Sequence, residues 1–166
     1  MAAAPVVIGV GNPLMGDDGF GLAVLERLRT AWEMPEGVEL IDGGTWGMNL
    51  LPAIEDAGAL IIVDAIDQGA PPGQDITLER NDLPRYLGLK LSPHQIDLRE
   101  VLALAELRGT LPQRAVAIGV QPEVIDLATA LSPRVAERVE AAATRVAWRL
   151  RRWGWPCRRA EVACTS

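Results

Sequence analysis

The sequence is poor in lysine and histidine, and each shortage excludes a class of function. Lysine occurs once, at Lys90, in a chain of 166 residues with a net charge of −6. Because phosphate binding needs a concentrated positive surface, this balance argues against a nucleic-acid partner. The single histidine, His94, would have to serve any Ser–His or Cys–His pair, and no G-x-S-x-G motif is present. The sequence therefore shows no nucleophilic triad.

Long apolar runs are also absent, and cysteines are few. No apolar segment approaches the roughly 20 residues that span a membrane, and residues 1–5 lack the charged start and apolar stretch of a signal peptide. The two cysteines, Cys157 and Cys164, lie near the C-terminus, where a disulfide would restrain only a tail. We therefore expect a cytoplasmic protein with no membrane insertion.

Short apolar segments alternate along the chain with segments of helical periodicity, which predicts a mostly parallel sheet covered by helices on both faces. No repeat or linker divides the sequence, so we expect one α/β domain over residues 1–154 and a flexible tail over residues 155–166. The expected strands are Pro5–Gly11, Val38–Ile41, Leu60–Val63, Asp75–Leu78 (an edge strand) and Ala115–Val120. The expected helices are Asp17 or Asp18 to Trp32, Met48–Asp56, Ser92–Gly109 and Ser132–Gly154.

Acidic residues follow three of the expected strands, at the edge where an open parallel sheet binds its ligands. Asp17 and Asp18 follow the first strand, Asp42 the second and Asp64 the third, while His94 follows the fourth after a loop. A carboxylate at the end of an apolar strand is costly unless it is paired, hydrogen-bonded or bound to a metal. Two carboxylates and an imidazole suit a divalent first-row metal ion and leave positions open for water or substrate. The pattern therefore indicates a metal site.

Each of these residues also has a purely structural interpretation. Either Asp17 or Asp18 is placed to serve as the N-cap of the first helix. Asp64 is placed to close a loop, and His94 lies near the start of a helix, where a lone histidine is often a surface residue. The pattern of residues leaves both interpretations open.

A nucleotide-binding turn is a weaker alternative. The glycines Gly9 and Gly11 follow a strand, as in a dinucleotide-binding loop, and Asp42 is placed to contact a ribose. However, Leu14 occupies the third glycine position, Pro13 removes a backbone N–H, and the acidic pair that follows would repel a pyrophosphate. Nucleotide binding is therefore disfavoured.

Five short blocks stand in order between residues 6 and 150. They are GVGNPLMGDDGFG at 9–21, DGGT at 42–45, LIIVDA at 60–65, SPHQ at 92–95 and GVQPE at 119–123. Each block is weak alone, but in this order and spacing they resemble the hydrogenase maturation protease family. The resemblance implies an α/β three-layer sandwich, in which a twisted, mostly parallel five-stranded sheet lies between helices. It also implies an endopeptidase that removes the C-terminal extension of a nickel–iron (NiFe) hydrogenase large-subunit precursor after nickel insertion.

The resemblance also implies which residues bind metal. The family's ligands correspond to Asp18, Asp64 and His94, and we expect Asp42 to add a catalytic carboxylate near the scissile bond. Many members of the family have glutamate where this chain has Asp18, so the carboxylate here reaches one methylene less far and Asp17 remains an alternative ligand. In this family the nickel is thought to belong to the substrate, and zinc or cadmium would occupy the same ligands in a crystal.

The resulting hypothesis is a nickel-gated peptidase. Asp18, Asp64 and His94 would dock onto the substrate's nickel, and an activated water would attack the scissile carbonyl. Two alternatives use the same residues. One is a nickel-site assembly factor without hydrolytic activity, and the other is a nickel-independent acid protease that pairs Asp18 with Asp64.

Overall fold

A five-stranded sheet lies at the centre of the protein, in the strand order β3-β1-β4-β6-β5. The computed structural model describes residues 3–44, 47–83 and 98–161. Strands β1, β3, β4 and β6 are parallel, while β5 lies at one edge and runs antiparallel to β6. The strands are β1 (Pro5–Gly9), β3 (Glu39–Asp42), β4 (Ala59–Ala65), β5 (Asp75–Glu79) and β6 (Ala115–Val120).

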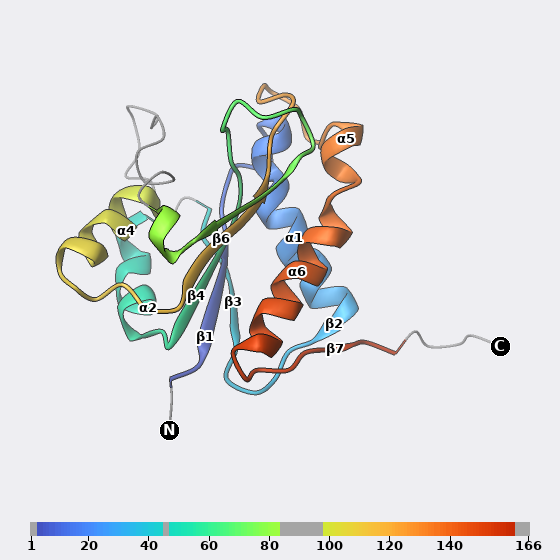
Figure 1. Ribbon diagram of the computed structural model, residues 1–166. Helices are drawn as coiled ribbons and strands as arrows, with labels where there is room; N and C mark the ends of the chain where they lie inside the picture. Colours follow the sequence, from blue (N-terminus) through green and yellow to red (C-terminus); the bar gives the residue numbers. More distant parts are fainter. Residues whose placement is uncertain (1–2, 45–46, 84–97, 162–166) are drawn as a thin grey trace.

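Helices cover both faces of this sheet (Figure 1). One face packs against α1 (Phe20–Ala31), α5 (Pro133–Ala136) and α6 (Val139–Arg152). The other packs against η2 (Gly47–Leu50), α2 (Leu51–Asp56) and α4 (Leu98–Leu107). The predicted three-layer α/β fold with a mostly parallel sheet is therefore confirmed, and so is the edge position of the Asp75 strand.

The central strand β4 explains why the core has two layers. All seven of its residues are buried, as expected for a strand covered on both faces. Leu60 and Ile62 pack under α2 and α4, whereas Ile61 and Val63 pack under α1 and α6. Because successive side chains point to opposite faces, Asp64 leaves the sheet on the side of α2 and α4.

Two helices differ from the prediction. The first helix begins with a 3-10 turn, η1 (Gly16–Gly19), and continues as α1, whose N-cap is Gly19. No side chain caps either segment, so the predicted N-cap role of Asp17 or Asp18 is wrong. The predicted last helix is divided into α5 and α6. Ser132 is the N-cap residue of α5, but its side chain makes no capping hydrogen bond.

The chain beyond the last helix contains a small strand that the sequence pattern did not predict. This strand, β7 (Arg158–Arg159), pairs antiparallel with β2 (Trp32–Glu33). Trp155 and Cys157, which precede β7, pack against the core beneath α1 and α6. Part of the predicted tail is thus attached to the body, while the domain limits themselves remain a prediction. None of the helices in the described ranges is long and apolar enough to cross a membrane.

Candidate functional site

Three predicted site residues lie at the carboxyl ends of neighbouring strands. In the sheet register, Gly9 at the end of β1 pairs with Asp42 on one side and with Val63, next to Asp64, on the other. The loop that leaves β1 leads into η1, which contains Asp18. Asp18, Asp42 and Asp64 therefore lie along the edge of the sheet formed by the carboxyl ends of the parallel strands, as predicted from the order of the strands.

The backbone of the first loop holds Asp18 in place. Its Oδ2 accepts a hydrogen bond from the backbone N–H of Asn12 at 2.9 Å, and Asp18 is only partly buried. Gly11 has a φ of 124°, and a methyl group there would lie 1.7 Å from the carbonyl oxygen of Asp18. Gly9 is equally constrained, since a methyl group there would lie 2.7 Å from the carbonyl oxygen of Gly21 in α1. These glycines allow close packing, which accounts for them without a pyrophosphate.

The neighbouring acid, Asp17, has the opposite environment. Its side chain is fully buried and accepts four hydrogen bonds. The donors are the backbone N–H groups of Glu123 (2.9 Å), Val124 (2.8 Å) and Ser132 (2.7 Å) and the hydroxyl of Ser132 (2.9 Å). Burial alone would raise the pKa of Asp17, but these hydrogen bonds outweigh it and hold the pKa below its usual value. Both oxygens of Asp17 are therefore committed to the fold.

Asp64 is a nearly buried carboxylate, 4% exposed, in the penultimate position of β4. Its register partner on β6 is Gly119, the first residue of the GVQPE block. A methyl group at Gly119 would lie 2.3 Å from the carbonyl oxygen of Asp64. The absence of a side chain at Gly119 therefore lets β6 approach the strand that carries Asp64.

The geometry of Asp42 differs from that of Asp64. The Asp42 side chain is exposed, and its Oδ1 accepts a hydrogen bond from the backbone N–H of Gly44 at 3.0 Å, which closes a turn. By alternation Asp42 shares the face of Leu40, which packs on the side of α1, so it leaves the sheet on the face opposite to Asp64. The structure brings Asp42 to the predicted edge with a turn-closing contact, and its catalytic role remains a prediction.

His94 lies outside the described residues, so the predicted set of three ligands is only partly visible. The sequence pattern predicts His94 at this edge because His94 follows the Asp75 strand. That strand is antiparallel, and its last residue, Glu79, pairs with Val116 near the start of β6. The strand therefore ends beside the amino-terminal ends of the parallel strands, and it does not by itself bring His94 to the site. Within the described ranges, no three His, Cys, Asp or Glu side chains form a group that could hold a metal.

Gln121 directly follows the carboxyl end of β6, and the sequence pattern did not single it out as a residue of the site. It is almost fully buried, and its Oε1 accepts hydrogen bonds from the backbone N–H groups of Gln68 (2.8 Å) and Ala70 (3.1 Å). Its Nε2 donates to Asp67 at 2.9 Å. Gln121 thus joins the loop after β4 to the end of β6, and its only sequence signal was its place in the GVQPE block.

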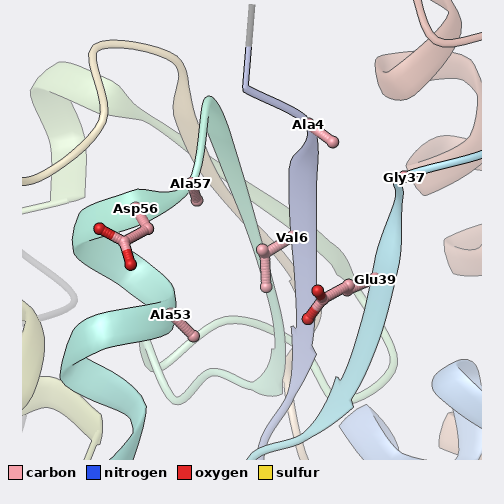
Figure 2. A pocket seen from close by; sticks show the side chains of 7 residues that line it. All are labelled: Ala4, Val6, Gly37, Glu39, Ala53, Asp56 and Ala57. Carbon is pink, nitrogen blue, oxygen red and sulfur yellow. The ribbon is translucent and has the colours of Figure 1, made fainter.

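A cavity of about 310 Å³ lies away from this edge. Figure 2 shows it beside β1, β3 and α2. Ala4 and Val6 lie just before and near the beginning of β1, and Glu39 is the first residue of β3. Since ligands of parallel sheets bind at the carboxyl ends, this cavity is not part of the candidate site. Its lining residues are Ala4, Val6, Gly37, Glu39, Ala53, Asp56 and Ala57.

Comparison with known proteins identifies relatives over most of the chain. The family described as hydrogenase maturation protease matches residues 22–148. The hydrogenase expression/formation protein HupD of Rhodobacter capsulatus is 42% identical over 151 residues, covering 90% of this chain and 72% of the relative. The hydrogenase 2 maturation protease of Escherichia coli K12 is 36% identical over 150 residues, covering 90% of this chain and 92% of the relative.

The fold agrees with solved structures of the same kind. The hydrogenase maturating endopeptidase HybD from Escherichia coli superimposes with a TM-score of 0.87 at 34% identity, covering 94% of this chain and 97% of the other. A NiFe hydrogenase maturation protease, HycI from Thermococcus kodakarensis, superimposes with a TM-score of 0.69 at 29% identity, covering 90% and 93%.

Proposed function

This chain belongs to the hydrogenase maturation protease family, and from that premise we propose that it removes the C-terminal extension of a NiFe hydrogenase large-subunit precursor after nickel insertion. The observation that carries the proposal is the pair Asp18 and Asp64, two carboxylates at one edge of the sheet. Asp17, the competing acid, is buried with both of its oxygens hydrogen-bonded. The enzyme is an endopeptidase, and we propose the cytoplasm as its location.

The position of helix α4, which follows His94 in the sequence, supports the inclusion of His94 in the site. His94 precedes Leu98, the first residue of α4, by four positions, a distance that a chain spans in at most about 14 Å. Helix α4 packs against η2, which follows the carboxyl end of β3, and it covers the face onto which Asp64 points. The helix that begins four residues after His94 therefore covers the face onto which Asp64 points, and this supports our proposal that the two residues act together.

In the proposed reaction the substrate supplies the metal. The nickel of the precursor provides Lewis-acid chemistry when it is bound. Asp18, Asp64 and His94 hold the nickel-loaded end of the precursor so that the scissile carbonyl faces a water molecule. A carboxylate accepts a proton as the water oxygen bonds to the carbonyl carbon, and the departing amide nitrogen takes up a proton as the C–N bond breaks. The products are the mature large subunit and a short peptide.

A protein substrate also needs a contact surface beside the site, and the loops near Asp18 offer one. Leu14 and Leu127 are 58% and 84% exposed, and Val124 and Ile125 are exposed as well. The two loops that carry them are joined by a β-bridge between Met15 and Ala128. Exposed apolar side chains gathered in this way are typical of protein-binding surfaces.

The test is cleavage of the purified precursor, with and without nickel, followed by a gel shift. We expect loss of a small C-terminal peptide from the nickel-loaded precursor alone. Asp64→Asn and His94→Ala should each lower kcat/KM by about 100-fold or more. Glu55→Gln is the matched control, because Glu55 accepts hydrogen bonds from Arg108 and Thr110 on the side of α2, away from the site.

Each other outcome favours a different alternative. Cleavage of nickel-free precursor that tolerates His94→Ala would support a nickel-independent acid protease. Binding of the nickel-loaded precursor without cleavage would support an assembly factor and would refute the proposed hydrolysis. A Cd²⁺ or Zn²⁺ titration of the free enzyme tests the ligand set separately, and binding that survives Asp18→Ala would exclude Asp18 from it.

A further inference from the structure

We infer that Asp17 is a positioning residue, whose buried carboxylate locks the loop of residues 121–132 onto η1 and thereby sets the direction in which Asp18 presents its own carboxylate. This inference rests on the role proposed for Asp18 and adds to it. Asp17 touches neither water nor substrate, since its side chain is fully buried, so its effect must pass through its neighbour.

The contact between η1 and this loop is held from both sides. Asp17 donates its backbone N–H to the carbonyl oxygen of Val124 at 2.9 Å, while its carboxylate accepts the N–H of Val124. Gly16 donates to the carbonyl oxygen of Ala128 at 2.9 Å. Gly16 has a φ of 61°, and a methyl group there would lie 2.8 Å from the carbonyl oxygen of Val124. The two segments are therefore as close as their backbones allow.

The carboxylate of Asp17 is the centre of this contact. It gathers donors from both ends of the loop, Glu123 and Val124 at the start and Ser132 at the end. All four groups around the side chain of Asp17 donate hydrogen bonds, so each of them needs an acceptor. Both oxygens of a carboxylate are acceptors, whereas an amide has one acceptor oxygen and one NH₂ donor. Asparagine at position 17 would turn its NH₂ group toward at least one N–H or O–H donor and leave that contact repulsive. The position therefore requires an ionised aspartate.

The coupling to Asp18 follows from the geometry of the turn. In a 3-10 helix with about three residues per turn, successive side chains point about 120° apart. With Asp17 pointing into the protein, Asp18 is turned toward the edge of the sheet, where its Oδ2 meets the N–H of Asn12. An aspartate has a single methylene, so its carboxylate follows its backbone closely. A shift of the turn at Asp17 must therefore displace the carboxylate of Asp18.

The experiment compares Asp17→Asn, Ser132→Ala and Glu55→Gln with the wild-type enzyme. Kinetic constants for the nickel-loaded precursor are measured per folded molecule, with the folded fraction taken from circular dichroism. We expect Asp17→Asn to lower kcat by about 10- to 100-fold and to change KM by less than about threefold. Ser132→Ala, which removes one of the four donors, should lower kcat by less than about fivefold. Glu55→Gln should leave kcat unchanged.

A second readout does not depend on cleavage. Cd²⁺ binding to the free enzyme reports how Asp18 is presented, and we expect Asp17→Asn to weaken it about tenfold. Hydrogen exchange at Glu123, Val124 and Ser132 should accelerate in the same variant, while that of β4 should not. If the wild-type enzyme fails to cleave the precursor, the proposed function fails, and Cd²⁺ binding still judges the role of Asp17. Unchanged kcat and unchanged Cd²⁺ affinity in folded Asp17→Asn would overturn the inference.

Discussion

At the scale of single residues, burial decides what each acid and thiol of this chain does. Asp17 and Asp18 are adjacent and chemically identical, yet one is buried in four hydrogen bonds and the other is partly exposed at the sheet edge. The third carboxylate, Asp64, is nearly buried at the end of an apolar strand, and the core around that strand sets its position. A residue's type is thus less informative here than its depth.

Cys157 gives a residue-scale prediction about pH. Burial raises the pKa of its thiol from the usual value of 9.0 to about 11. Since the thiolate is the reactive form, its fraction at pH 8 should be about 100-fold lower than for an ordinary thiol. In a Cys164→Ser background, iodoacetamide should therefore modify Cys157 slowly at pH 8 and progressively faster up to about pH 11. Rapid labelling at pH 8 would show that Cys157 is not held in its half-buried position.

At the scale of elements, close approach between α1 and the sheet shapes the site. A methyl group at Gly21 would lie 2.2 Å from the carbonyl oxygen of Val63 and 2.5 Å from that of Val10. Helix α1 can therefore reach the ends of β1 and β4 only through a residue without a side chain. This contact keeps η1, and with it Asp18, next to the strand that carries Asp64.

Gly21→Ala tests this packing. We expect it to destabilise the fold by about 3 kcal/mol or more, because backbone atoms cannot move aside as a flexible side chain can. Gly109→Ala is the matched control. Gly109 has a φ of 71°, and a methyl group added there would meet no atom within 4 Å beyond its chain neighbours, so alanine should cost only about 1–2 kcal/mol of backbone strain. Urea unfolding followed by circular dichroism compares them, and equal losses would contradict close packing at Gly21.

At the scale of the whole molecule, the chain after α6 returns to the body of the protein. Ala160 donates its backbone N–H to the carbonyl oxygen of Ala31 at 2.9 Å, beside the pairing of β7 with β2. The guanidinium of Arg159 lies over the ring of Trp32, 4.6 Å from its centroid, and the same arginine pairs with Glu140 of α6 at 2.5 Å. The end of the chain thereby ties α1 to α6.

Truncation after Gly154 tests whether residues 1–154 suffice as a domain. The shortened protein should fold, because the sheet and both helical layers lie within these residues. Its melting temperature should fall by about 5–10 °C, since Trp155 and Cys157 lose their packing against the core and β2 loses its partner. An unchanged melting temperature would mean that the segment contributes nothing to stability, and complete unfolding would refute the predicted domain limit.

Alternation of apolar and helical segments determined the layered fold, since burial of both faces of β4 requires helices on each side. The sequence also placed Asp18, Asp42 and Asp64 on one edge, because parallel strands end together. Only the tertiary structure decided the direction of β5, which depends on a crossing between distant segments that local pattern does not encode. It likewise separated Asp17 from Asp18, because the four donors that bury Asp17 come from residues more than a hundred positions away.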